Sequence, residues 1–398
     1  MGDPSLTVWA IFGFPLIFLT GTSFVLLRNA IDFTELAETE KSVDSQQKQP
    51  EQTLVSVCIP ARNEERNIER CLNAVVSQDY PNLEILVLDD QSEDDTGRII
   101  QRFADENSHL TLLRGRDRPS GWLGKPWACR QLADQTTGDI LVFIDADCFL
   151  EEEALSRLVQ SFQEDELDAL TVWPRQILGS FWEKVLIPAV YYALLAFLPA
   201  AYVHRKPRWM PGFIHKKISH WFAAACGQCI AFKRSAYAGI GGHASVKNEI
   251  VEDVALAKLL KRQGLKIKMF HGVGTVSCRM YSNENEIFEG FRKNFFAGFG
   301  YRTFPFLLAG FIHLWVYVLP VLLLPAVILT TSPLLLVLLP TLILIGLHRL
   351  LLNLIFDWPL HYFWAQPLAV LWFTRLSVTT LVDFYRSRTI QWKNRDIL

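Results

Sequence analysis

Blocks of hydrophobic and polar residues alternate regularly between residues 54 and 147. Apolar runs typical of buried strands occur at 54–60, 83–90, 110–115 and 139–147. The intervening segments 64–78, 94–107 and 125–137 are polar enough and long enough to be helices. The first of them repeats apolar residues at helical spacing. Strands that alternate with helices predict βαβ units, hence an α/β fold with a mostly parallel sheet covered on both faces.

Long uncharged runs flank this region. Residues 4–27 contain no Lys, Arg, Asp or Glu, and neither do residues 303–348. We therefore expect an N-terminal transmembrane anchor at 1–31, a linker at 32–53, and a C-terminal membrane region at 301–398. Within that region the spans are predicted at about 305–329 and 334–354. The stretch 360–385 carries Arg375 and Asp383, and we expect it to lie in the interface, with a third full span as the alternative.

The composition agrees with a membrane protein and excludes some functions. Half of the 398 residues are hydrophobic, and the net charge of −2 gives no basic field for nucleic acid. The seven cysteines are scattered apart from Cys226 and Cys229, which favours reduced thiols over a disulfide framework. No second pair at ligand spacing completes a zinc site with them, so packed thiols are the expected reading rather than a redox or zinc pair.

A further uncharged run, 185–203, is long enough to cross a membrane. A crossing would separate residues 204–300 from the preceding strands, although both look like parts of one soluble unit. We therefore predict an interfacial segment at 185–221, broken by Pro188 and Pro199. The basic and aromatic stretch 204–221 suits the level of the lipid headgroups, and a loop over the active site is the compatible alternative.

Acidic side chains follow several of the predicted strands. Glu64 follows the first, Asp89 and Asp90 end the second, and Asp145 and Asp147 end the strand at 139–147. The carboxyl ends of parallel strands share one edge of a sheet, where ligands bind. Carboxylates gathered there predict an anionic crevice that needs a divalent metal, hydrogen-bond donors on a ligand, or both.

Four motifs in order give this chain a family resemblance over residues 54–300. The segment that begins "VSVCIPARNEER" resembles the opening of the inverting family 2 glycosyltransferases with a GT-A fold, and "DAD" stands where that family has D-x-D. "GQCIAFKRSAYAGIGG" and "VEDVAL" resemble its acceptor-side strand and E-D motif. Residues 279–298 and 392–397 are similar to the bacterial carotenoid and hopene-associated glycosyltransferases. The resemblance implies a GT-A domain between one N-terminal transmembrane helix and C-terminal transmembrane or interfacial helices.

The resemblance also implies roles for individual residues. Asp145 and Asp147 would hold Mn²⁺ or Mg²⁺, whose preferred ligands are hard oxygens. Asp253, beside Glu252, would be the base that takes the acceptor's proton; the plain alternative is that both acids stabilise a helix start. The related processive synthases carry a Q-x-x-R-W motif near the pyrophosphate, a string that this chain lacks. Arg292 would stand in for the arginine of that motif, with Arg279 as the weaker candidate. The remaining nucleotide-sugar contacts are expected at Pro60, Ala61, Asn63, Glu64, Asp89, Asp90, Lys125, Asp145 and Ala146.

Lys125 has a plain alternative too, as a solvated lysine at a helix start. The implied reaction moves one sugar from a nucleotide-diphosphate donor, with a UDP-sugar expected, to a hydroxyl of a lipid, with a carotenoid or other isoprenoid or polycyclic lipid expected. The implied location is the bacterial inner membrane with the 54–300 domain on the cytoplasmic side. Two other classes stay open: a processive polysaccharide synthase, which would need more spans, and a non-catalytic membrane scaffold.

Overall fold

The structure is a computed structural model that describes residues 6–38, 53–386, 391–392 and 395–396. The chain divides into two compact units. The sheet domain comprises Phe33–Ile177 and Ala200–Met280, and the helical unit comprises Met1–Asp32, Leu178–Pro199 and Tyr281–Leu398. Each unit is described by itself.

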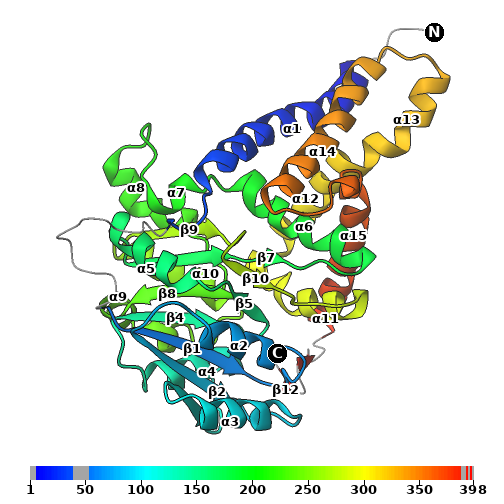
Figure 1. The fold of residues 1–398 in the computed structure, drawn as a ribbon. Coiled ribbons are helices and arrows are strands. Elements are labelled where there is room, and N and C mark those ends of the chain that lie inside the picture. Colours follow the sequence, from blue (N-terminus) through cyan, green and yellow to red (C-terminus); the bar gives the residue numbers. More distant parts are fainter. Residues whose placement is uncertain (1–5, 39–52, 387–390, 393–394, 397–398) are drawn as a thin grey trace. The chain divides into compact units, whose positions relative to one another are not determined.

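In the described part of the sheet domain, seven strands form one mixed sheet (Figure 1). Only β8 runs against its neighbours β4 and β6, and the other pairs are parallel. The mostly parallel sheet predicted from the sequence is thus confirmed. In spatial order its strands are β3 (Leu110–Arg114), β2 (Leu83–Asp89), β1 (Val55–Ala61), β4 (Ile140–Ile144), β8 (Cys229–Lys233), β6 (Ala169–Trp173) and β9 (Ile267–His271).

A small second sheet lies in the same domain and consists of β5 (Cys148–Leu150), β10 (Val276–Cys278) and β7 (Arg175–Gln176). The helices of the domain are α2 (Ile68–Val76), α3 (Thr96–Glu106), α4 (Gly124–Ala133), α5 (Ala154–Glu164), α7 (Ala201–His204), α8 (Gly212–Ile218), α9 (Arg234–Gly239) and α10 (Glu252–Arg262). All the strands and helices predicted between residues 54 and 147 are present.

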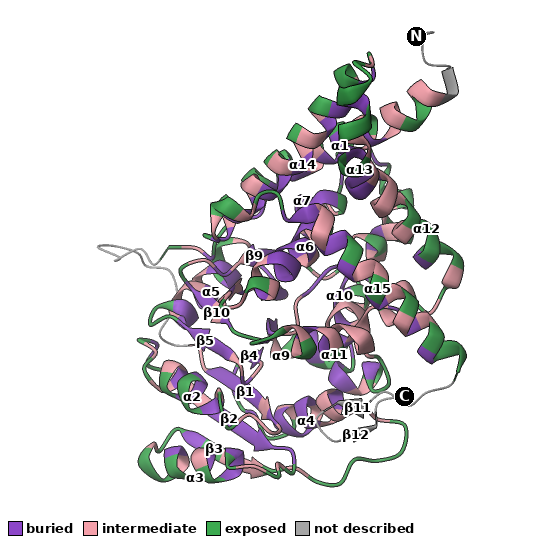
Figure 2. Ribbon diagram, turned by 90° about the vertical axis from the view of Figure 1, so that its right-hand side faces the viewer, coloured by how far each residue is buried: buried purple, intermediate pink, exposed green. Residues whose placement is uncertain are grey.

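The core follows from the apolar runs. Five consecutive residues of β4 are buried, and β1 is buried at six of its seven positions, as expected for strands with helices on both faces (Figure 2). Val57 and Ile59 of β1 share one hydrophobic cluster with Ile68 and Leu72 of α2. Because this core fixes the strands, the residues that directly follow them are held at one edge of the sheet.

The predicted linker at 32–53 is described only at its start, since residues 39–52 lie outside the described chain. Residues 33–38 pack on the sheet domain. The carbonyl of Thr34 accepts a hydrogen bond from His271 N at 3.0 Å, and Ala37 N donates to Ser161 Oγ at 2.9 Å.

The helical unit holds the predicted membrane segments. Among the described residues, four helical stretches are long and apolar enough to cross a membrane: Val8–Asp32, Thr303–Leu329, Leu335–Ile355 and Gln366–Tyr385. The unit's helices are α1 (Leu6–Asp32), α6 (Phe181–Phe197), α11 (Glu284–Asn294), α12 (Thr303–His313), α13 (Leu319–Leu329), α14 (Leu335–Ile355) and α15 (Gln366–Tyr385), with a π-helical turn at Leu314–Val318. Residues 391–392 and 395–396 form the short strands β11 (Gln391–Trp392) and β12 (Arg395–Asp396); the other residues of the predicted 392–397 motif lie outside the described chain.

One prediction about this unit is wrong. Pro188 does not break the helix at 181–197, and only the break near Pro199 is present. A proline removes the N–H that would bond to the carbonyl four residues earlier, here that of Lys184. The fully buried Arg349 of α14 replaces that donor, because its Nη2 lies 2.6 Å from Lys184 O and 3.1 Å from Val185 O. The helix therefore continues through the proline.

Candidate active site

Asp145 and Asp147 leave the sheet where β4 ends. The five preceding residues are buried, whereas both aspartates are half-buried and Ala146 between them is buried. Asp145 N donates to Gln228 O at 3.0 Å, and Cys148 N donates to Asp145 O at 3.0 Å. These two bonds hold the D-x-D segment in a tight turn against the start of β8.

Lys125 lies at the centre of the site. Its Nζ is 2.6 Å from Asp145 Oδ1, 3.3 Å from Glu252 Oε1 and 3.1 Å from Gly227 O. A cation in the first turn of α4 opposes the helix dipole, and the two carboxylates compensate for that. Burial lowers the pKa of Lys125, but Asp145 and Glu252 outweigh burial and hold the pKa well above its usual value. Lys125 is therefore a cation held between two carboxylates. A solvated lysine at a helix start would need neither of these contacts.

Asp253 and Glu252 begin α10 and complete the acidic group. Asp253 Oδ2 accepts from Gly227 N at 2.6 Å and its Oδ1 accepts from Val254 N at 2.7 Å. Burial, followed by the charge of Glu252, raises the pKa of Asp253 to about 7, against the opposing effects of Lys125 and these two bonds. A carboxylate with a pKa near neutrality is suited to accept and release a proton.

Gly227 joins these groups and was not identified as a site residue from the sequence. A Cβ at this position would lie 3.1 Å from Lys125 Nζ and 3.3 Å from both Asp253 Oδ2 and Glu252 Oε1. Because residue 227 has no side chain, its backbone fits between the ammonium of Lys125 and the carboxylates of Glu252 and Asp253. In the sequence this residue is simply the glycine of "GQC", and nothing in that string indicates which side chains surround it.

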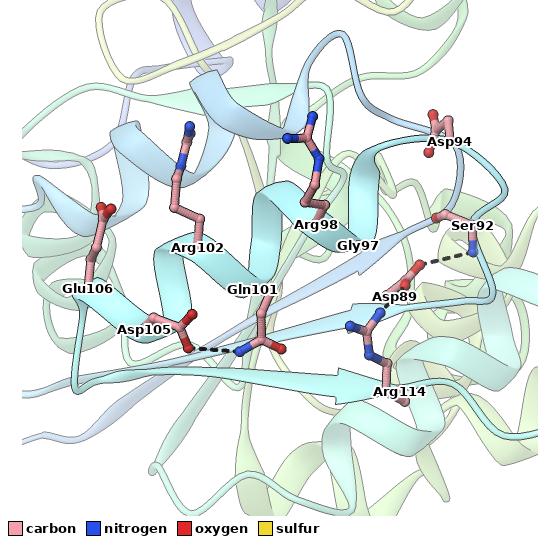
Figure 3. A pocket seen from close by; sticks show the side chains of 10 residues that line it. All are labelled: Asp89, Ser92, Asp94, Gly97, Arg98, Gln101, Arg102, Asp105, Glu106 and Arg114. Atoms are coloured by element: carbon pink, nitrogen blue, oxygen red, sulfur yellow. Dashed lines mark hydrogen bonds and ion pairs between the residues drawn. The ribbon is translucent and has the colours of Figure 1, made fainter.

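Asp89 and Asp90 have different surroundings. Asp89 bonds to Arg114 Nη1 at 2.6 Å and to Ser92 N at 3.0 Å, and it lines a groove of about 690 Å³ beside α3 (Figure 3). Asp90 is buried, and its N donates to Ala61 O at 2.8 Å. Asp89 therefore faces the α3 groove, whereas Asp90 is enclosed beside the end of β1.

The loop after β1 is fixed by its own polar groups. Asn63 has a φ of 51°, its Oδ1 accepts from Glu93 N at 2.9 Å, and its N donates to Ser92 Oγ at 3.1 Å. Glu64 N donates to Thr96 Oγ1 at 2.7 Å. These bonds tie the loop after β1 to the loop after β2. Pro60 and Ala61 lie just before this loop, at the end of β1.

The two candidate arginines lie in different units. Arg292 belongs to the helical unit, where its Nη2 is 2.7 Å from Asp383 and its Nη1 is 3.2 Å from Glu289. Arg279 belongs to the sheet domain, is exposed, and donates its backbone N to Asp147 O at 3.2 Å. The backbone of Arg279 is therefore attached to the D-x-D segment, and the guanidinium of Arg292 is held by two carboxylates.

The sheet order, with D-x-D after β4 and an acid pair opening α10, agrees with the GT-A fold expected from the sequence. Residues 56–241 match the family model "Glycosyl transferase family 2". Residues 216–397 match "Glycosyl transferase family 21".

Two relatives align with about two thirds of the chain. A 4,4'-diaponeurosporenoate glycosyltransferase of Staphylococcus haemolyticus is 29% identical over 247 residues, which are 61% of each chain. The protein of the same name in Staphylococcus aureus is 27% identical over 267 residues, 66% of each chain. The similarity thus spans less than two thirds of either relative. A solved mannosyltransferase of Pyrobaculum calidifontis, in complex with GDP-Man and Mn²⁺, superposes with a TM-score of 0.48 at 20% identity, over 72% of this chain and 70% of that one.

Proposed function

We propose that this protein is an inverting glycosyltransferase that moves one sugar from a nucleotide-diphosphate donor, a UDP-sugar, to a hydroxyl of a membrane-dissolved carotenoid or related isoprenoid lipid. The observation that carries the proposal is the arrangement around Gly227. There a D-x-D aspartate, a lysine and the E-D acids meet from three separate segments. The relatives' names supply the acceptor class.

The donor would bind at the carboxyl edge of the sheet. Asp90 would accept hydrogen bonds from the base, and Pro60, Ala61, Asn63 and Glu64 would line the loop beside it. Lys125 holds its ammonium beside Asp145 and would contact the diphosphate once the donor is bound. Arg279, attached through its backbone to Asp147, is a better candidate for a second phosphate contact than Arg292.

The acids after β4 fit a divalent cation. Mg²⁺ and similar ions take one or two protein carboxylates and complete their shell with phosphate oxygens and water. Two carboxylates from one turn would leave the other coordination positions of such an ion to phosphate oxygens and water. Asp145 and Asp147 would hold Mn²⁺ or Mg²⁺, which would stabilise the charge of the departing nucleoside diphosphate.

Asp253 would act as the base. It would take the proton of the acceptor hydroxyl as that oxygen attacks the anomeric carbon on the face opposite the leaving group. Gly227 N and Val254 N hold the carboxylate in one orientation, each by one hydrogen bond. Burial, followed by the charge of the neighbouring Glu252, raises the pKa of Asp253, and Glu252 also pairs with Lys125.

We further propose that the sheet domain contacts the membrane through residues 204–221. Trp209, Phe213 and Trp221 are 70%, 79% and 71% exposed, and the same stretch holds five Lys and Arg but no acid. Exposed aromatic rings with surrounding cations suit the headgroup layer of an anionic leaflet. The protein would lie in the bacterial inner membrane with this domain in the cytoplasm, where nucleotide sugars are made.

The C-terminal topology stays a proposal as well. α15 is apolar and long enough to cross, and we propose that it lies in the interface, which keeps the cationic tail inside. Of that tail's Arg386, Arg388, Lys393 and Arg395, the second and third lie outside the described residues. Labelling of a cysteine added at the C-terminus decides this: labelling only from the periplasmic side would show that α15 spans.

Comparison of lipid extracts from cells with and without the protein tests the function. Mass analysis should show a lipid larger by one hexose only when the protein is present. Asp145→Ala, Asp147→Ala and Asp253→Asn should abolish that product in membranes that contain normal amounts of protein. Asp139→Ala, at the exposed opposite end of β4, is the matched control and should retain activity. A polymer instead of a singly glycosylated lipid would favour the processive synthase, and full activity of Asp253→Asn would exclude Asp253 as the base.

A further inference from the structure

Two buried cysteines lie directly behind the D-x-D turn. β5 and β10 are antiparallel, and their register places Cys278 opposite Cys148. Both cysteines are 0% exposed. The Cys148 and Cys278 sulfurs and a carboxylate oxygen of Asp147 all lie within 4.8 Å of one another, which makes them the one such group of three metal-ligand side chains in the described part of the chain.

The strand register brings the two sulfurs together. Arg279 N donates to Asp147 O, and Glu151 N donates to Thr275 O, so the hydrogen-bonded pairs lie on either side of the cysteines. Such pairs alternate with non-hydrogen-bonded pairs, in which the side chains are closer. The cysteines occupy a non-hydrogen-bonded pair and project from the same face.

Two polar side chains border the sulfurs, one from the turn before β5 and one from the residue before β8. Asp147 lies in the turn before β5, and its Oδ1 is 3.7 Å from Cys148 Sγ. On the other side, Gln228 Nε2 donates to Cys278 Sγ at 2.9 Å, and Gln228 Oε1 accepts from Gln176 Nε2 at 2.9 Å. The side-chain amide of Gln228 thus borders Cys278 Sγ, and its backbone O accepts from Cys148 Sγ at 3.4 Å. Half a turn of the amide would present its oxygen to Cys278 Sγ.

We propose that Asp147, Cys148 and Cys278 bind a thiophilic divalent ion, Zn²⁺ in particular, with Gln228 or a water as the fourth ligand. Two sulfurs and one carboxylate are a donor set for tetrahedral Zn²⁺ and not for Mg²⁺, which requires oxygen. Binding replaces the two thiol protons, which leave to solvent.

This site shares Asp147 with the D-x-D pair. An ion held by both sulfurs would draw the Asp147 carboxylate away from the position where it would hold Mn²⁺ or Mg²⁺, so Zn²⁺ would inhibit the transferase. This consequence rests on the proposed function, whereas ion binding itself does not.

Co²⁺ spectroscopy of the purified full-length chain in detergent tests the site without any activity. One equivalent of Co²⁺ should produce thiolate-to-metal charge-transfer absorption and the intense visible bands of tetrahedral Co²⁺, and Zn²⁺ should remove both. Cys148→Ser and Cys278→Ser should each lose the charge-transfer band, while Cys58→Ser, at an equally buried cysteine of β1, should keep it. Absence of the band in the wild type overturns the proposal whatever the variants do, as does its persistence in Cys278→Ser.

A second measurement links the site to transfer. At a fixed Mn²⁺ concentration, Cys278→Ser should have unchanged activity without Zn²⁺ and need at least tenfold more Zn²⁺ for half-inhibition than the wild type. Equal sensitivity of the two proteins would overturn the shared role of Asp147. Recovery of a Cys148–Cys278 disulfide from protein prepared under reducing conditions would overturn the metal site. If no sugar transfer is found at all, the Co²⁺ spectrum still decides the site.

Discussion

Removal of the Lys125 cation should move the pH dependence of transfer. Lys125 is one of the groups that lower the pKa of Asp253, whereas burial and Glu252 raise it, to about 7. Lys125→Gln removes that cation and keeps a polar side chain of similar length. The pKa of Asp253 should therefore rise. Because Asp253, as the proposed base, would work only when it is ionised, the acidic limb of the pH profile should shift to higher pH.

The size of the shift follows from the position of the lysine. An opposite charge at close range changes a carboxyl pKa by about 1–3 units, and the 35% exposure of the Lys125 side chain places this one near the lower end. With a pKa raised from about 7 to roughly 8, the ionised fraction of Asp253 at pH 7 falls from about one half to about one tenth, a loss of about fivefold. At pH 9 nearly all of the base is ionised in both proteins.

The assay measures the release of nucleoside diphosphate by the detergent-solubilised protein in the presence of its lipid acceptor. The pH is varied from about 5.5 to about 9.5, because this range brackets the pKa of a general base that works near neutrality. The quantity to compare is the wild-type to Lys125→Gln ratio of kcat/KM at pH 7, divided by the same ratio at pH 9. This quotient should be about five, and it cancels any pH-independent loss of diphosphate binding.

Lys125→Arg is the matched control, because it keeps the charge beside Asp145 and Glu252. Its midpoint should stay near that of the wild type. A quotient near one for Lys125→Gln, with an unchanged midpoint, would refute the electrostatic coupling between Lys125 and the base.

Other consequences of the structure can be measured as directly. Chelation with EDTA should abolish transfer. Added Mn²⁺ or Mg²⁺ should restore transfer by the wild type but not by Asp147→Ala. Activity that survives EDTA would exclude a metal requirement. Gly227→Ala should lower kcat about tenfold without changing the melting temperature, since its Cβ would lie 3.1 Å from Lys125 Nζ and a small displacement of reacting groups is costly. Arg279→Ala should raise the KM for the donor. Arg292→Ala should instead lower the melting temperature, because the buried Asp383 loses this partner. The reverse pattern would restore Arg292 as the phosphate contact. Arg349→Met should lower the free energy of unfolding by about 1–3 kcal/mol, because carbonyls of α6 lose their donor; the matched change at the exposed Arg375 should have little effect.

The sequence by itself determined the secondary structure of the sheet domain and the presence of acidic residues at the carboxyl edge of its sheet. Apolar runs such as that of β4 have one stable placement, inside a covered sheet, and the acids that follow such a run must then emerge at its end. The long uncharged segments likewise predicted the apolar helices, because their length and composition are local properties.

The tertiary structure decided which of these residues meet. Lys125 and Glu252 are 127 positions apart, and neither spacing nor composition indicates that the two hold one ion pair. The role of Gly227 depends on the atoms around it, and the continuity of α6 through Pro188 depends on a donor from α14. The pairing of Cys148 with Cys278 depends on strand register. Local patterns fix what a segment buries, whereas ion pairs, close backbone approaches and cross-strand neighbours are fixed only when distant segments pack together.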